Sequence, residues 1–392
     1  MIPIQLTEYE PQLLPQDALP ASVGTALWRE FGDKIAVEFP SPKTNYQWRL
    51  TALGWVGHIP LTADIHLLLT PKVNLENLFR MWAYAYTLRS AHWLDGVIDS
   101  GSLAEFYEQL AGLLAQRAMK RGRQGFHRAY LTRTEKRPYL RGQLQLRRIW
   151  QEPGQPILTS RFEEQTADIP DNQILAYTLS QIARNRRCGE QTQTAVRRAA
   201  HLLQSIAIPH SFQPQDCVGR SYTRLNQDYE SMHALCRFFL EHTGPTHERG
   251  DRQMSPFLVN MARLYELFVA EWLKVHLPTP WHIKAQERVT VGKWDELTFD
   301  VDLVLYDDDG RAQAVLDTKY KTPDKPANDD ISQIVTYAKA KGCHEAVLIY
   351  PAALQRPLDL MIGDIRLRTL AFTLDGDLEQ AGQQFLDKLL LK

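Results

Sequence analysis

The pattern of hydrophobic and polar positions divides the chain into regions of different character. Residues 1–72 hold short apolar runs rich in β-branched and aromatic residues, such as "KIAVEF" and "WRLTALGWVGHIPL", which Pro and Gly separate. This pattern is typical of strands joined by turns. From residue 73 the apolar positions recur at helical spacing, first in "NLENLFRMWAYAYTL" and then in "SLAEFYEQLAGLLAQRAMKRG". We therefore expect a β-rich N-terminal region followed by a mostly helical one.

The helical pattern resumes at about residue 172 and continues until a stretch rich in Gly, Pro and charge, at 243–256, interrupts it. Such a stretch is typical of a domain boundary. Beyond it the pattern predicts a helix at 257–277, three strands, a second helix, two strands and a closing helix. Strands placed between helices in this way predict a mixed sheet that helices cover on both sides. The chain is thus expected to be an α+β multidomain protein with domains at residues 1–72, 73–250 and 251–392.

The composition is that of an ordinary globular protein. The 392 residues are 44% hydrophobic and 23% charged, and the formal net charge is -1, which suits domains with buried cores. Four widely spaced cysteines without a CxxC pair favour reduced thiols in the cytoplasm. The N-terminus lacks the basic start and the apolar core of a signal peptide. Since no apolar stretch is long enough to span a bilayer, we expect a cytoplasmic protein without membrane contact.

A basic tract lies between the helical segments, at residues 120–150. Because the overall charge is near neutral, any contact with nucleic acid must use a local patch of this kind. Two interpretations remain open: a solvated, positively charged β-hairpin, or a surface for phosphates or for an acidic partner subunit. The candidate DNA-binding or partner-binding residues are Arg121, Arg123, Arg128, Arg133, Lys136, Arg137 and Arg141.

Acidic residues on neighbouring predicted strands indicate a metal site. Side chains alternate along a strand, so Asp300 and Asp302 share one face, and Asp317 and Lys319 share one face. If these strands pair through the turn "DDDGR", Asp302 and Asp317 approach each other. Facing carboxylates repel, which raises a pKa or requires a cation, and one or two carboxylates suffice to hold Mg²⁺. A lysine beside that ion can position or help to deprotonate the attacking water.

Other residues strengthen this hypothesis only in combination. An Asp-x-Lys sequence alone is common on surface strands. Glu266, within "ARLYELFVAEW", would alone be the polar side of an amphipathic helix. Gln333 and Tyr337 would alone be a packing pair on one helix face. Together with the strand acids and the lysine, these three residues complete a set that fits a nuclease site.

This set resembles the PD-(D/E)xK nuclease superfamily, and within it the RecB-like branch with its trailing Gln-x-x-x-Tyr. The resemblance implies a restriction-endonuclease-like α/β fold for residues 251–392, with metal-dependent catalysis. One departure from the pattern is Val301, which stands where the family has proline, so Asp300 remains a rival for the first ligand position. The matched residues are Asp302, Asp317 and Glu266 as metal ligands, with Lys319, Gln333 and Tyr337 completing the catalytic set.

Sequence blocks outside that domain resemble the McrC family, the nuclease component of McrBC 5-methylcytosine-specific restriction systems. These blocks are "NLFRMWAYAY", "LRGQLQL", "DIPDNQILAYTL" and "YTRLNQDYESM". The resemblance runs from about residue 70 to the C-terminus. It is more specific than the nuclease signature, because a generic RecB-like enzyme would not share these blocks.

The McrC resemblance implies a division of labour between two proteins. The C-terminal domain cuts double-stranded DNA with Mg²⁺, while the N-terminal part docks into a hexameric McrB-like AAA+ GTPase and stimulates it. GTP is then bound by the partner, and this sequence contains no GxxxxGK[ST] phosphate-binding loop. The alternatives are a stand-alone RecB-like DNA repair or processing nuclease and a non-catalytic regulator of a GTPase ring.

Overall fold

The computed structural model describes residues 2–62, 65–86, 102–144, 158–185, 187–208, 210–242, 256–291 and 297–391. By proximity of Cα atoms the chain separates into two compact units. Unit 1 comprises Met1–Phe106 and His242–Lys392, and unit 2 comprises Tyr107–Glu241. Both predicted domain boundaries, at 72 and at 250, fall within unit 1, and the predicted division into three domains remains a prediction. Most of the boundary stretch at 243–256 lies outside the described residues.

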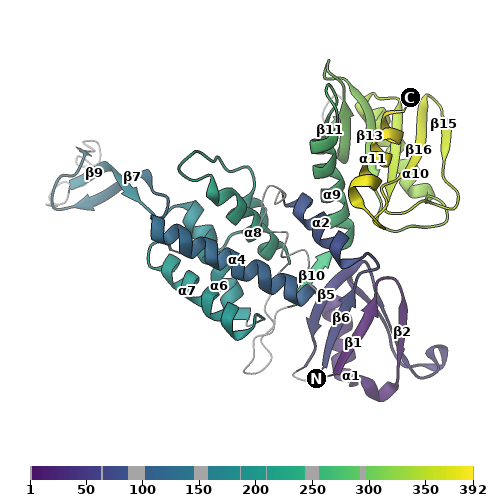
Figure 1. The fold of residues 1–392 in the computed structure, drawn as a ribbon, viewed down its shortest axis with the longest axis horizontal. Helices are drawn as coiled ribbons and strands as arrows, with labels where there is room; N and C mark the ends of the chain where they lie inside the picture. Colours follow the sequence, from purple (N-terminus) through teal and green to yellow (C-terminus); the bar gives the residue numbers. More distant parts are fainter. Residues whose placement is uncertain are drawn as a thin grey trace. The chain divides into compact units, whose positions relative to one another are not determined.

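The N-terminal part of unit 1 combines β-strands with a helix (Figure 1). Its elements are β1 (Ile2–Thr7), β2 (Pro11–Leu14), α1 (Ala21–Phe31), β3 (Ile35–Glu38), β4 (Trp48–Ala52), β5 (Trp55–Pro60) and β6 (Ile65–Thr70). One sheet has β6 between β1 and β5, and another has β4 between β2 and β3. Buried aliphatic residues of both sheets form one core with Trp48.

Helix α1 lies in the region for which the sequence predicts strands and turns. Pro20 and Gly24 are residues typical of turns, so the local sequence does not predict this helix. The helix buries Phe31 in the N-terminal core. Gly24 lets the ring of Trp48 approach, because a Cβ at Gly24 would lie 2.2 Å from that ring. Tertiary packing therefore outweighs local propensity in this segment.

Strand β10 (Phe257–Asn260) pairs with β5 and so extends the N-terminal sheet, in the order β1-β6-β5-β10. The helix predicted from residue 257 begins only at Met261, as α9 (Met261–His276). The side chain of Asn260 caps α9 by accepting a hydrogen bond from a backbone N–H of its first turn. Gly57 permits the close approach of β10, because a Cβ there would lie 2.0 Å from the Phe257 carbonyl oxygen. The N-terminal sheet is thus completed by residues that follow unit 2 in sequence.

The C-terminal part of unit 1 contains the predicted mixed sheet. Its strands lie in the order β11-β12-β13-β14-β16-β15, in which β11, β12 and β13 are antiparallel and β13, β14 and β16 are parallel. This order confirms the predicted series of helices and strands, apart from β15, which was not predicted. The elements of this part are β11 (His282–Val291), β12 (Leu297–Tyr306), β13 (Ala312–Thr318), α10 (Asn328–Lys341), β14 (Glu345–Tyr350), β15 (Asp359–Ile362), β16 (Ile365–Ala371) and α11 (Leu378–Leu390). Helix α2 (Leu75–Ala85) comes much earlier in the sequence, directly after the N-terminal strands.

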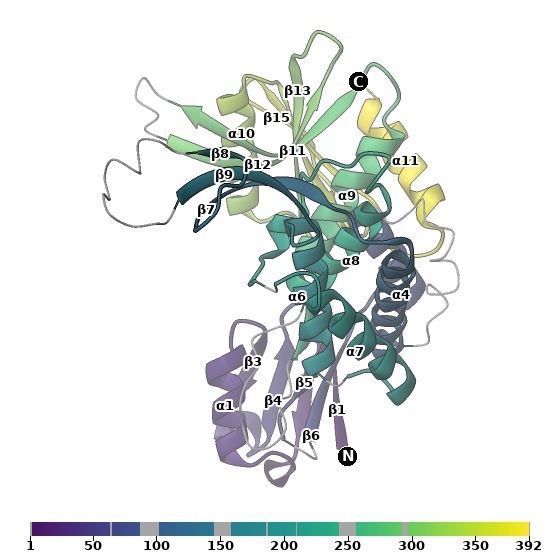
Figure 2. The ribbon, with the colours of Figure 1, turned by 90° about the vertical axis from the view of Figure 1, so that its left-hand side faces the viewer.

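Helices cover both faces of this sheet, as predicted (Figure 2). On one face, Ile334 of α10 belongs to the same buried cluster as Val315 of β13. On the other face, Trp272 of α9 and Phe385 of α11 both contact the ring of Phe372, which follows β16. Helix α2 packs along α9 and so joins this part of unit 1 to the N-terminal strands.

Unit 2 contains helices and a small sheet. Its elements are α4 (Leu103–Gln124), β7 (Ala129–Arg137), β8 (Gln143–Leu144), β9 (Leu158–Thr166), α6 (Pro170–Asn185), α7 (Glu190–Gln204) and α8 (Asp228–His242). We call the sheet β7-β9-β8 the arm, and it projects beyond the ends of the helices of unit 2 (Figure 1). The hairpin predicted at 120–150 is wrong in its pairing, because the tract begins within α4 and β7 pairs with β9. Residues 145–157 lie outside the described residues.

The helices and mixed sheets confirm the predicted α+β class. Within the described ranges, no helix is long and apolar enough to cross a membrane.

Candidate active site

Two carboxylates face each other across strands β12 and β13. The strands are antiparallel with Leu303 opposite Leu316, so the next pair of the ladder places Asp302 opposite Asp317. Asp317 is only 4% exposed, and Asp302 is half-buried. The structure therefore brings together the two strand acids that the sequence singles out.

The pKa of Asp302 reflects this proximity. Burial raises it, and the hydrogen bond and negative charge of Asp317 raise it further, to about 7, against the opposing effects of Lys319 and the Thr318 backbone N–H. An aspartate in water has a pKa of about 4. Near neutral pH the pair therefore holds a proton for much of the time when no cation is bound.

Lys319 lies one residue beyond the end of β13, and its side chain reaches the same pair. Its Nζ lies 2.7 Å from Asp317 Oδ2 and 3.3 Å from Asp330 Oδ1. Burial lowers the pKa of Lys319, but attraction to Asp317 and Asp330 outweighs burial, so its pKa is raised. The ammonium is therefore protonated at neutral pH and can hold a water molecule or offset negative charge beside the acids.

Asp330 and Tyr350 also belong to the surroundings of this site, although the sequence did not single them out. Asp330 lies in the first turn of α10, where the helix dipole favours a negative charge. Its neighbour Asp329 is also an acid in the first turn of α10, so the sequence alone does not show which of the two lies near Lys319. Tyr350 is 1% exposed, and burial and the negative charge of Asp330 raise its pKa to about 12. Its hydroxyl has no hydrogen-bond partner among the described residues.

Glu266 does not join the strand acids in one cluster. Its Oε1 accepts hydrogen bonds from Arg263 at 2.5 Å and from Gln286 at 3.1 Å. Gln286, which has a φ of 52°, lies on β11 between Ala285 and Glu287, which pair with Leu303 and Val301 of β12. In the part of the chain that the structure describes, no three His, Cys, Asp or Glu side chains are placed to hold a metal ion. The role of Glu266 as a metal ligand remains a prediction.

Gln333 and Tyr337 form a pair on α10. The Gln333 amide donates to the Tyr337 hydroxyl at 2.8 Å, and the Tyr337 ring lies 5.5 Å from the ring of Phe299 on β12. The pair thus connects α10 with the strand that carries Asp302. Its expected role toward DNA or the active site remains a prediction.

Asp300, the rival for the first ligand position, has a different environment. It is exposed and pairs with Arg288 at 2.9 Å, and this hydrogen bond holds its pKa below the usual range. Arg288 therefore already neutralises Asp300, whereas Asp302 faces a second carboxylate. Of the two residues, only Asp302 faces Asp317, and its role as the first ligand remains a prediction.

Several of the predicted basic residues are engaged within unit 2. Arg121 of α4 pairs with Asp228 and donates to the Leu225 carbonyl, so it stabilises the helical part of the unit. The acids of β9 lie outside the basic tract, and they offset part of its charge. The ion pairs on the arm join Arg133 and Arg141 to Glu164, and Arg137 to Glu135.

The remaining basic residues are exposed. They are Arg123 at the end of α4, Arg128 just before β7, and Lys136 on β7. Large apolar side chains are exposed beside them on the arm, among them Tyr130 and Tyr139. A surface of this kind, basic with exposed aromatic groups, is suited to contact with a partner.

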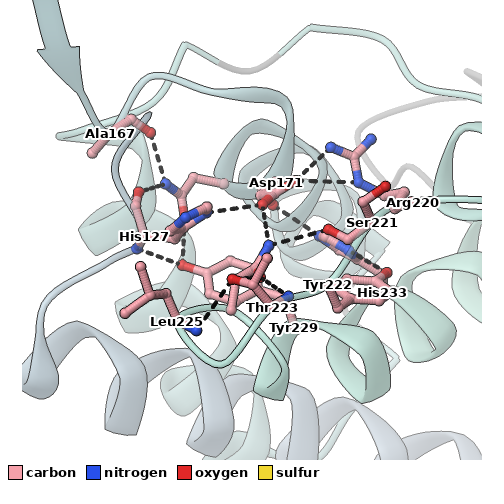
Figure 3. A network of polar contacts seen from close by, with 12 residues as sticks. His127, Ala167, Asp171, Arg220, Ser221, Tyr222, Thr223, Leu225, Tyr229 and His233 are labelled. Atoms are coloured by element: carbon pink, nitrogen blue, oxygen red, sulfur yellow. Dashed lines mark hydrogen bonds and ion pairs between the residues drawn. The ribbon is translucent and has the colours of Figure 1, made fainter. Parts of the chain in front are cut away.

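A polar network holds both ends of the arm against the helices (Figure 3). The Asn172 amide donates to the carbonyls of His127, just before β7, and of Ala167, just after β9, at 2.9 and 2.7 Å. The Asp171 carboxylate pairs with His127 and Arg220. Burial raises the pKa of Asp171, but the hydrogen bonds from Arg220 and its neighbours outweigh burial and lower it. The block "DIPDNQILAYTL", which the sequence analysis singled out, therefore anchors the base of the arm.

The fold and the site define a class of protein: an α+β chain with an acid pair on adjacent strands of a helix-covered sheet and a lysine just after the second strand. Residues 50–351, well over half of the chain, match the family described as "McrBC 5-methylcytosine restriction system component". The chain belongs to this family. The match confirms the resemblance to McrBC systems that the sequence blocks indicated.

The fold is similar to a chain in the "Refined half-complex from tetradecameric assembly of Thermococcus gammatolerans McrB AAA+ hexamers with bound McrC", with a TM-score of 0.52 and 17% identity over 99% of both chains. A chain in the cryo-EM structure of the Thermococcus gammatolerans McrBC complex matches with a TM-score of 0.43 and 18% identity, over 69% of this chain and 87% of that chain. At such low identity the likeness concerns the fold alone. A search of curated proteins finds no match.

Proposed function

We propose that this chain is a Mg²⁺-dependent endodeoxyribonuclease, the DNA-cutting subunit of a GTP-dependent restriction complex directed at modified cytosine. The observation that carries the proposal is the convergence of Asp302 and Asp317, on adjacent strands, with Lys319 just beyond the end of β13. Membership of the McrBC family supports the restriction role. The C-terminal part of unit 1 is then a PD-(D/E)xK domain of the RecB-like branch, which its mixed sheet between helices fits.

The residues at the site fit a small, hard divalent cation. Asp302 and Asp317 offer carboxylate oxygens, which Mg²⁺ prefers, and a cation would relieve the repulsion between them. When bound, Mg²⁺ would supply Lewis-acid polarisation of the scissile phosphodiester and a more acidic water. Lys319 would orient that water and offset charge that develops on the phosphate. Glu266 is a proposed further ligand, and its Oε1 accepts hydrogen bonds from Arg263 and Gln286.

We also propose that the partner is a hexameric McrB-like AAA+ GTPase and that the arm docks into it and stimulates GTP hydrolysis. Two features support this assignment. The similar solved chain belongs to an assembly of McrB AAA+ hexamers with bound McrC. The arm is a projecting element with exposed basic and aromatic side chains, and its base is held by hydrogen bonds from the buried Asn172.

Replacing Lys319 by alanine tests the nuclease role. The purified chain is mixed with the AAA+ protein that is encoded beside it, methylated or unmethylated DNA, GTP and Mg²⁺. Both DNA cleavage and GTP hydrolysis are then measured. We expect Lys319→Ala to reduce cleavage by about 10²–10³-fold while GTP hydrolysis stays at the wild-type rate, because the arm is unchanged. The exposed Lys339 of α10 supplies the control, and Lys339→Ala should cut like the wild type.

Cleavage at the wild-type rate by Lys319→Ala would remove this lysine from the mechanism. Cleavage by the wild-type chain without partner and GTP would instead favour the stand-alone nuclease.

Reversing charge at the base of the arm tests the docking role. The double variant Arg123→Glu, Arg128→Glu should lower the stimulation of the partner GTPase by about tenfold or more, because like charges at an interface cost several kcal/mol. Arg197→Glu, Arg198→Glu provides a control with the same charge change on exposed residues of α7 in the same unit. Equal loss of stimulation in both double variants would point to net charge rather than to the arm.

A further inference from the structure

Lys319, the catalytic lysine that we propose, is the first residue after strand β13. Strand β13 ends at Thr318, and the Lys319 backbone N–H makes a last hydrogen bond to the Ile349 carbonyl at 2.8 Å. The side chain of Lys319 must nevertheless be held accurately, because a displacement of about 1 Å in an active site can cost about 10²-fold in rate. The residues that follow Lys319 therefore decide how firmly its backbone is fixed.

Those residues are held by the N-terminal part of unit 1. The Tyr320 hydroxyl donates to Glu8 Oε2 at 3.0 Å, and the same oxygen accepts the Lys72 backbone N–H at 3.1 Å. Lys321 follows, and its Nζ lies 5.4 Å from the centre of the Tyr9 ring. Two consecutive residues after β1 thus hold two consecutive residues after the proposed catalytic lysine, more than 300 positions away in sequence.

The environment of Glu8 is costly for a carboxyl group. Glu8 is 0% exposed, and Tyr320 is 8% exposed. A buried carboxyl group destabilises a fold unless its hydrogen bonds compensate for lost hydration. The Tyr320 ring also lies 6.1 Å from the ring of Tyr265 on α9, so the phenol is oriented from two sides. An apolar side chain at position 8 would fill the space but could not hold the Tyr320 hydroxyl.

We propose that Glu8 is a positioning residue for Lys319. By holding the Tyr320 hydroxyl, Glu8 fixes the rotation of the backbone from which the lysine side chain projects toward Asp317 and Asp330. Successive side chains of an extended chain point in opposite directions, so anchoring position 320 on one side sets the direction of position 319 on the other. This inference rests on the proposed nuclease function for its consequence in catalysis, but the contact itself can be tested without cleavage.

The first test measures the exposure of the lysine in the metal-free full chain. Brief acylation followed by mass spectrometry reports the reactivity of each lysine, with Lys339 as an internal reference. In Tyr320→Phe we expect Lys319 to be labelled several-fold faster than in the wild type, because the ammonium is no longer held between its acids. Glu8→Leu should give the same increase, whereas Glu8→Gln keeps an oxygen that accepts the phenol hydrogen and should retain slow labelling.

The second test measures cleavage by the complex with the partner, GTP and Mg²⁺. We expect Tyr320→Phe to lower kcat about tenfold or more while KM for DNA is unchanged, because Tyr320 is buried and its substitution leaves the exposed surface as it is. Tyr265→Phe is the matched control: it also loses one buried phenol hydrogen bond, to the Phe372 carbonyl at 3.2 Å, and should lower the melting temperature similarly without changing kcat.

Wild-type labelling of Lys319 in Tyr320→Phe would overturn the inference. Equal losses of kcat in Tyr320→Phe and Tyr265→Phe would also overturn it, since both would then reflect stability alone. If the wild-type complex cuts no DNA, the proposed function fails, while the labelling experiment still decides whether Glu8 positions Lys319. Should Glu8→Leu fail to fold, Tyr320→Phe decides the question, because it removes a single oxygen atom.

Discussion

Asp302→Asn is expected to abolish DNA cleavage and, at the same time, to raise the melting temperature of the metal-free chain. Cleavage should fall about a thousandfold or more, since asparagine offers the proposed Mg²⁺ a neutral and weaker ligand. Stability should rise because the substitution removes the repulsion between two facing carboxylates. A gain on the order of 1–2 kcal/mol is expected at pH 8. Opposite effects on activity and stability are typical of a residue kept for function.

The stability difference should depend on pH in a defined direction. The folded state holds the Asp302 proton more tightly than the unfolded state, because the pKa rises from about 4 to about 7. Wild-type stability should therefore fall relative to Asp302→Asn as the pH rises from about 4 through the folded pKa of about 7, and the difference should level off toward pH 8. Thermal unfolding between pH 4 and pH 8, with and without Mg²⁺, measures this, and Mg²⁺ should stabilise only the wild type.

Asp300→Asn is the matched control for this experiment. Asp300 lies two residues away on β12, is exposed, and pairs with Arg288. Its substitution should leave cleavage near the wild-type rate and should not stabilise the chain. If Asp300→Asn abolished cleavage and Asp302→Asn did not, the assignment of the first ligand would be reversed.

Arg368→Met is expected to destabilise the C-terminal part of unit 1 by about 2–4 kcal/mol. Arg368 is 6% exposed, and its guanidinium donates to the carbonyls of Lys388, Leu389 and Leu391 at the end of α11. It also forms an ion pair with Glu345 of β14. Methionine fills similar space but leaves these carbonyls and the carboxylate without a donor. Thermal unfolding and hydrogen exchange of α11 amides measure the loss.

The neighbouring strand position supplies the comparison for this variant. Arg366, two residues earlier on β16, pairs with Asp359 at 2.8 Å, but its side chain is 37% exposed. Because exposed ion pairs contribute about 0–1 kcal/mol, Arg366→Met should change stability little. Equal effects of the two substitutions would show that burial at Arg368 is not what makes it stabilising.

The sequence predicts the C-terminal sheet well because its signals are local. Apolar strands of suitable length alternate with amphipathic helices there, and the acids follow the two-residue period of a strand. The two-residue period and the short turn between β12 and β13 predict that Asp302 and Asp317 approach each other if the two strands pair. Their exact register was not predictable, because it includes a shift between Leu305 and Tyr306.

Features that depend on distant residues could not be predicted in this way. The strand at 257–260 continues a helical pattern, and it becomes β10 only because β5 offers an edge and Gly57 leaves room. The arm pairs β7 with β9, whose sequence lies beyond the basic tract. The contact of Glu8 with Tyr320 joins residues more than 300 positions apart, and no local sequence pattern predicts it. In each case the deciding partner is far away in sequence.

The placement of β10 has a consequence for how the protein is made. During translation, all of unit 2 is synthesised between β5 and residues 257–260, so β5 emerges from the ribosome long before β10 and presents an unpaired edge in the meantime. Unpaired edges are prone to join other chains. A nascent chain stalled or cut near residue 250 should therefore aggregate through this edge, and a chaperone that shields it until β10 arrives should raise the yield of intact protein.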